Sequence, residues 1–251
     1  MSQRDKDDLK LAVLIDADNV PFSNVKGMME EIAKYGTPTT KRIYGDWTKL
    51  PDKGWKSVLL ENAITPIQQY GYTTGKNATD SAMIIDAMDI LYSDKVDGFC
   101  IVSSDSDFTR LATRLRESGM KVIGIGEKKT PNPFIVACDR FIFIEVIEGA
   151  KKKKVVSTNA TADDKKKDEK ALSKIDVDTI DIIESSIEDI AEDDGWAFLG
   201  DVGNLIVKKK PEFDPRNYGF SKLTPLMKSL THLLEIHERE SDKKGIKHVY
   251  V

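Results

Sequence analysis

Two aspartates stand two positions apart, Asp105 and Asp107, in the stretch SSDSDFTRL that directly follows an apolar run. Asp16 and Asp18 stand at the end of another apolar run, in LIDADN, and Asp46 ends KRIYGD. Carboxylates that gather at one place repel one another, so they persist only beside a cation or with raised pKa values. Oxygen ligands suit hard divalent cations, and we therefore expect Mg²⁺ or Mn²⁺ at these acids.

Asp80 joins this set because it opens a helical pattern, from which its side chain can lean toward the ends of the strands. We predict a catalytic metal centre whose ligands are Asp16, Asp80, Asp105 and Asp107. Such a centre supports phosphoryl transfer to water, since a metal ion orients and deprotonates the water and neutralises charge on the phosphate. A nucleophile paired with histidine is not indicated in the α/β region, because all three histidines come after residue 230.

Each acid also has an ordinary structural explanation. Asp or Asn after a strand is a common cap or turn residue, which accounts for Asp18, Asn19 or Asp107 one at a time. That explanation accounts poorly for four acids at one edge of a sheet. Asp86 comes six residues after Asp80, about 120° around the helix, so we expect it at the rim or in a structural hydrogen bond.

The elements that would position these acids alternate between apolar strands and amphipathic helices. The predicted strands are 11–16, 41–46, 64–70, 98–105, 121–126 and 140–146, with helical patterns near 24–35, 55–62, 80–91 and 107–119. Unbroken apolar runs are typical of strands buried on both faces of a parallel sheet. The alternation predicts an α/β fold with helices on both sides of that sheet. Ligands of such sheets bind beyond the carboxyl ends of the strands, where the acids stand.

The chain is predicted to contain two domains. The α/β pattern occupies residues 1–149. Residues 150–172 are rich in charge and almost free of apolar side chains, which predicts a flexible linker. Residues 173–251 carry three helical patterns and then two β-like runs around a charged turn, which predicts a small winged helix-turn-helix domain.

Composition limits the class of protein. Of 251 residues, 40% are hydrophobic and 32% charged, as in soluble proteins. No apolar run approaches the roughly 20 residues of a membrane span, so we expect a cytoplasmic protein without a membrane partner. A net charge of −4 means that any nucleic-acid binding must use local patches. Cys100 and Cys138 lie in separate apolar segments and are expected to be buried thiols.

The motifs LIDADN, IYGD, ATDSAMIIDAM and IVSSDSDFTRL, followed by GMKVIGIG, resemble the NYN family, also called LabA-like, within the PIN-like nuclease fold. The resemblance covers about residues 10 to 148 and implies a PIN-like parallel sheet with a metal-dependent ribonuclease centre. By motif match it implies Asp16, Asp80, Asp105 and Asp107 as metal-binding acids. Four further positions are expected to support them, namely Asp18, Asn19, Asp46 and Ser104. Asp18 is an extra carboxylate, because the family usually has a glycine in that region.

The C-terminal region resembles the LOTUS domain, also called OST-HTH, through Gly195, Trp196, Tyr218 and Gly219 among other positions. That resemblance implies RNA binding or, in some members, docking to a protein. The candidate phosphate-binding residues of this region are Lys208, Lys209, Lys210, Arg216, Lys222 and Lys228, and Lys76 is a further candidate in the α/β region. Trp196 and Tyr218 can stack on bases, although such aromatics more often pack in a core or turn.

Three functional hypotheses follow. The leading one is a ribonuclease whose LOTUS domain holds RNA near the metal centre; the second is a regulatory adaptor that binds RNA without cleaving it. The third is a haloacid-dehalogenase-like phosphatase. That chemistry requires a Ser or Thr after the second strand, where this chain has Gly45 and Asp46, and it has no role for Asp80. DNA as a substrate, a protein partner of the LOTUS domain and a homodimer stay open at this stage.

Overall fold

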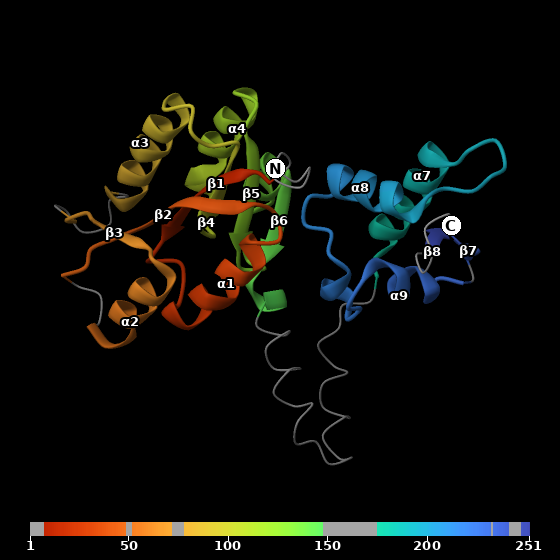
Figure 1. Cartoon of the computed structure of the whole chain (residues 1–251), viewed down its shortest axis with the longest axis horizontal. Coiled ribbons are helices and arrows are strands. Elements are labelled where there is room, and N and C mark those ends of the chain that lie inside the picture. The colour runs from red at the N-terminus through yellow and green to blue at the C-terminus, as the bar shows by residue number, and fades with distance from the viewer. Residues whose placement is uncertain (1–7, 49–51, 72–77, 148–174, 232, 241–246) are drawn as a thin grey trace, which may run out of the picture. The chain divides into compact units, whose positions relative to one another are not determined.

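A computed structural model describes residues 8–48, 52–71, 78–147, 175–231, 233–240 and 247–251. The chain divides into two compact units, Met1–Lys154 and Val155–Val251, whose helices and strands are drawn in Figure 1. Each unit has its own buried hydrophobic side chains. The predicted linker at 150–172 and Lys76 lie outside the described residues. None of the helices in the described ranges is long and apolar enough to cross a membrane.

The first unit is built on a six-stranded sheet in which every pair of neighbours is parallel, as the sequence predicts. The strand order is β3-β2-β1-β4-β5-β6. The strands are β1 (Lys10–Asp16), β2 (Thr37–Gly45), β3 (Thr65–Gln68), β4 (Gly98–Val102), β5 (Lys121–Gly126) and β6 (Arg140–Phe143).

Helices cover both faces of this sheet because the strands bury side chains on both faces. Along β1, Leu11, Val13 and Ile15 enter one core, while Ala12 and Leu14 enter the other. The first core is completed by α1 (Val25–Ile32) and α2 (Asp52–Asn62), and the second by α3 (Ala78–Tyr92), α4 (Thr109–Glu117) and α5 (Asn132–Ala137) (Figure 1). The α/β sandwich fits a PIN-like fold.

The strand order reverses direction between β1 and β4. From β1 the chain moves outward through β2 and β3, and it then returns by way of α3 to place β4 on the other side of β1. Such a switch point leaves a crevice beyond the carboxyl ends of the two central strands, where open α/β sheets bind their ligands. Asp16 is the last residue of β1, and the SSDSD stretch follows β4.

The structure places the end of β4 three residues before the predicted end. The strand stops at Val102, and Ser106–Phe108 form a short 3-10 helix, η3, ahead of α4. The Ser103 backbone N–H still donates to the Ile125 carbonyl at 3.0 Å, while the Ser103 hydroxyl donates to Asp16 and the Ser104 hydroxyl accepts from the Glu127 backbone N–H. Asp105 is therefore on the loop after β4 rather than on the strand, and Asp107 lies in η3.

The second unit consists of α7 (Val177–Ile190), α8 (Leu199–Lys209), the short 3-10 helix η6 (Pro215–Tyr218) and α9 (Leu223–Lys228), followed by a hairpin of β7 (His237–Glu240) and β8 (Lys247–Tyr250). Helix α7 begins at a cap, since the Asp176 carboxylate accepts from the Thr179 backbone N–H at 2.8 Å. Apolar residues from the three helices and the hairpin form one core, as the periodicity predicts.

Candidate functional site

Asp16 is an acid buried at the end of β1, with 1% of its surface exposed. Its carboxylate accepts hydrogen bonds from the Asn19 amide at 2.5 Å, the Ser103 hydroxyl at 2.9 Å and the Asp18 backbone N–H at 3.0 Å. Burial raises the pKa of Asp16, and these three donors oppose that rise. The donors hold the carboxylate in one orientation at the switch point.

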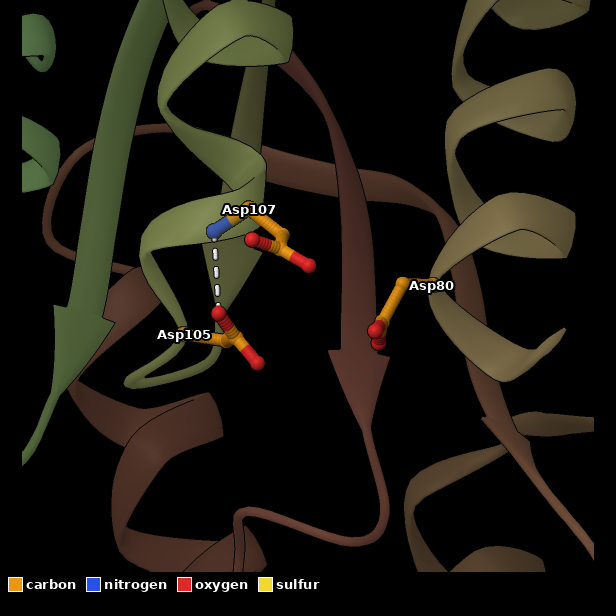
Figure 2. A group of neighbouring side chains, drawn as sticks. All are labelled: Asp80, Asp105 and Asp107. Carbon is orange, nitrogen blue, oxygen red and sulfur yellow. Dashed lines mark hydrogen bonds between the residues drawn. The ribbon is translucent and has the colours of Figure 1, made fainter. Parts of the chain in front are cut away.

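A backbone hydrogen bond connects the two closely spaced acids Asp105 and Asp107. The Asp105 carboxylate accepts from the Asp107 backbone N–H at 2.9 Å and caps η3. The cap considered for Asp107 is thus supplied by Asp105, whose second carboxylate oxygen points away from the Asp107 backbone, on the side of Asp80 (Figure 2). Asp105 is half-buried and Asp107 is exposed, so water and ions can reach both.

Asp80 approaches these acids from the first turn of α3. Asp80, Asp105 and Asp107 each place one carboxylate oxygen within 4.8 Å of the others (Figure 2). Three of the four predicted ligands are therefore brought together, although Asp80 precedes Asp105 by 25 positions in the chain. Asp16 lies outside this set of three, and its carboxylate is held by Asn19 and Ser103.

Burial and the neighbouring negative charges act together on the pKa of Asp80. Its pKa is raised to about 6, first by burial and then by the negative charges of Asp16, Asp105, Asp107 and Asp18. A carboxylate whose pKa rises this way is one that a cation would stabilise. The donor set consists of hard oxygen atoms only, and it fits Mg²⁺ or Mn²⁺ rather than a metal that prefers sulfur or imidazole.

A serine that the sequence analysis did not single out connects the acids. Ser103 donates to Asp16 at 2.9 Å and accepts from the Asp105 backbone N–H at 3.1 Å. Ile15 pairs with Val102 in the sheet, so the next residues, Asp16 and Ser103, are neighbours across the two strand ends. The strand register, once known, identifies Ser103; the sequence alone does not give that register.

The predicted supporting residues have different positions. Ser104 is buried, and its hydroxyl accepts from the Glu127 backbone N–H at 2.9 Å, which ties the β4 loop to the loop after β5. Asp46 accepts from the Thr48 hydroxyl at 2.6 Å and the Gln68 amide at 3.0 Å, so it organises the loops beyond β2 and β3. Asp18 is exposed, and its charge contributes to the raised pKa of Asp80.

Asp86 is engaged in a structural hydrogen bond, one of the two outcomes expected for it. Its carboxylate accepts from the Tyr44 hydroxyl and pairs with the Arg42 guanidinium, both on β2. Burial and the Asp86 charge raise the pKa of Tyr44, so its hydroxyl keeps the proton that it donates. These contacts join α3, the helix that carries Asp80, to β2.

The basic side chains of the second unit are mostly paired with acids. Lys209 pairs with Asp189 at 2.7 Å, Arg216 with Asp214 at 2.7 Å and Lys228 with Glu238 at 2.9 Å. Lys210 donates to the Thr179 hydroxyl at 2.6 Å and lies 3.6 Å from Asp176. Lys208 and Lys222 are exposed, and no ion pair to either occurs among the described side chains.

The two aromatic candidates of the second unit differ. Tyr218 is buried, with its hydroxyl 3.0 Å from the Thr179 hydroxyl and its ring against Phe213. Trp196 is half-exposed and lies beside the hairpin. Tyr218 is therefore a core residue, while Trp196 remains accessible to a ligand.

Comparison with protein families matches the NYN domain over residues 10–148 and the OST-HTH/LOTUS domain over residues 170–246. Among solved structures, the chain is similar to a protein of unknown function from Vibrio parahaemolyticus RIMD 2210633, with 20% identity, a TM-score of 0.47, and coverage of 56% of this chain and 94% of that one. It is also similar to an uncharacterised protein from Nitrosomonas europaea, with 28% identity, a TM-score of 0.30, and coverage of 37% and 85%. Comparison with curated proteins gives no match.

The NYN match extends over more than half of the chain and includes the whole sheet with its acids. The phosphatase alternative is less well supported, because it has no role for Asp80. In the structure Asp80 lies together with Asp105 and Asp107. The chain belongs to the NYN family of the PIN-like nuclease superfamily and carries a C-terminal OST-HTH/LOTUS domain.

Proposed function

We propose that this protein is a metal-dependent ribonuclease that hydrolyses RNA phosphodiester bonds at Asp80, Asp105 and Asp107, with Asp16 beside them. The observation that carries the proposal is the convergence of three carboxylate oxygens within 4.8 Å at the switch point of the sheet. The nuclease-like NYN domain and the OST-HTH/LOTUS domain, which suggests RNA binding, support it.

The residues of the site divide the work. A bound Mg²⁺ or Mn²⁺ supplies a more acidic water and neutralises charge on the phosphate. Asp80, Asp105 and Asp107 would hold that ion from two separate places, the first turn of α3 and the first turn of η3 with its cap. Asp16 is fixed by Asn19 and Ser103, and its negative charge favours a cation at Asp80.

In this proposal the second unit binds the RNA substrate and supplies no catalytic residue. A domain that binds RNA on the same chain raises the effective concentration of RNA at the metal centre without adding a catalytic contact. His237 and His248 lie on the hairpin of that unit, which has its own hydrophobic core.

Cleavage of end-labelled single-stranded RNA tests the proposal. We expect cleavage in Mg²⁺ or Mn²⁺, no cleavage in EDTA, and a loss of about 100-fold or more in Asp105→Asn, because a ligand of the ion is neutralised. Asp89→Asn is the matched control, since Asp89 is an exposed acid on the same helix as Asp80, and it should cleave as wild type does.

A parallel reaction with single-stranded DNA shows whether the substrate class is limited to RNA. If the wild-type protein cleaves no RNA with either ion but still binds it, the ribonuclease proposal fails and the protein is an RNA-binding adaptor. If Asp105→Asn cleaves as fast as Asp89→Asn, the acids are not the catalytic centre.

A further inference from the structure

The hairpin of the second unit belongs to a small sheet with two different faces. Ala197 exchanges backbone hydrogen bonds with Val251 at 2.9 and 3.0 Å, so the segment around residue 197 lies beside β8 in an isolated antiparallel bridge of Phe198 with Tyr250. Ala197, Val249 and Val251 point inward to the core. Alternation along the strands sends their neighbours to the opposite face.

That opposite face, here called the hairpin face, consists of Trp196, Phe198, His237, Arg239, His248 and Tyr250. Ala197 is fully buried while Phe198 is 37% exposed, which shows the alternation directly. The cross-strand pairs His237 with Tyr250 and Arg239 with His248 keep four members on the same side of the hairpin.

The members of the hairpin face lie in contact as one layer. The Trp196 and His237 rings are 5.6 Å apart between centroids, and the Phe198 ring is 5.4 Å from His248 and 5.8 Å from Tyr250. The Arg239 guanidinium lies 4.4 Å from the centroid of the Tyr250 ring and 5.9 Å from that of Trp196. Five rings and one guanidinium therefore form a continuous surface.

Every side chain of this layer ends in a flat π system, and none is a bulky aliphatic residue. The solvent face of an antiparallel sheet is normally polar, so an aromatic one marks an interaction site. Flat rings beside a guanidinium are the surface on which unpaired bases stack.

We propose that the hairpin face is a stacking platform for unpaired bases of single-stranded RNA. The inference deepens the proposed function, because it names the surface that holds the substrate and the form of RNA that fits it. The pairing of Lys209, Lys210 and Arg216 with acids leaves that side of the domain a weaker site for phosphate. Arg239 supplies the cation of the platform, and its only ion pair among the described side chains is an exposed one to Asp194 at 3.3 Å.

Binding of a fluorescein-labelled, ten-nucleotide single-stranded RNA to the full chain in EDTA tests this proposal by anisotropy. EDTA prevents metal-dependent cleavage, so failure of the nuclease proposal and failure of the platform are read separately. We expect Phe198→Leu and Tyr250→Leu each to weaken binding by about 5- to 100-fold, the cost of losing a stacked base. The salt dependence should not change, because neither substitution removes a charge.

Two controls make the result specific. Phe198→Trp keeps a ring and should bind within about threefold of wild type, as stacking tolerates any flat π face. Tyr92→Leu removes an aromatic side chain that is 72% exposed on α3, and it should not affect binding. A fully paired duplex of the same sequence should bind more weakly, because its bases are not free to stack.

Trp196 reports the contact directly, because it is the only tryptophan after residue 55. RNA should quench part of the tryptophan fluorescence, and Trp196→Phe should abolish that quenching. Wild-type affinity in both Phe198→Leu and Tyr250→Leu, with circular dichroism showing a folded protein, would overturn the proposal and leave the face to a protein partner. Equal losses in Phe198→Leu and Phe198→Trp would overturn it too, because they would assign the loss to packing.

Discussion

At the scale of single residues, the site consists of acids that are buried or lie close enough to repel one another. Asp16 is buried among three donors, and Asp80 has a pKa raised to about 6 by burial and by the surrounding carboxylates. Neither arrangement favours folding in the absence of a cation, since each raised pKa marks an ionised form that the fold disfavours. Residue type and position predicted both acids, Asp16 at the end of a strand and Asp80 at the start of a helix.

Asp80→Asn should therefore stabilise the metal-free protein at pH 7.5 by about 1 kcal/mol, because it removes a repelled charge. The folded pKa of Asp80 lies above its unfolded value of 3.8, so the folded state binds this proton more tightly. The wild type then gains stability as pH falls from 7.5 through 6, and the advantage of Asp80→Asn disappears toward pH 4. Chemical denaturation of both proteins in EDTA measures this, and a destabilised Asp80→Asn at pH 7.5 would contradict it.

At the scale of elements, the site depends on how α3 lies against the sheet. Asp80 is in the first turn of this helix, and Asp86, about 9 Å further along the axis, is tied to Tyr44 and Arg42 on β2. A helix fixed at one turn carries the side chains of the neighbouring turn with it. Asp86, Tyr44 and Arg42 are therefore positioning residues in this account, because they act on the ion through Asp80.

Tyr44→Phe tests this role, since it removes one donor to Asp86 and keeps the ring. We expect the free energy of unfolding to fall by about 1 kcal/mol. Cleavage should fall by about tenfold, as is typical when support of a metal ligand is lost, and higher Mn²⁺ should restore part of the rate. Tyr92→Phe, an exposed tyrosine on α3, is the control and should change neither quantity. An unchanged rate in a destabilised Tyr44→Phe protein would make the contacts purely structural.

At the scale of the whole molecule, patterns in the sequence predicted most of the architecture. The alternation of apolar strands and helices gave the parallel α/β sheet, and the three helices and hairpin of the second unit appear in the predicted order. The order of strands within the sheet could not be read, because it depends on which strands pair across long connections. That order decides that Ser103 faces Asp16 and that Asp80 joins Asp105 and Asp107.

In the second unit, the sequence did not predict the ion pairs of the basic residues or the aromatic surface of the hairpin. Counting lysines pointed to a phosphate patch, but charge in a sequence says nothing of the acids that pair with it in space. The hairpin face was also hidden, because Trp196 and Phe198 are far in the chain from His237 and Tyr250. One aromatic surface is assembled only when the segment between α7 and α8 lies beside the C-terminal hairpin.

The most direct test of this account is the binding of Mn²⁺, followed by the electron paramagnetic resonance signal of the free ion. The account predicts saturable binding to the wild type and to Asp89→Asn, and binding that is at least about tenfold weaker in Asp105→Asn, because a carboxylate ligand is replaced by an amide. Equal binding by Asp105→Asn and Asp89→Asn, or no saturable binding by the wild type, would contradict the claim that Asp80, Asp105 and Asp107 hold a metal ion.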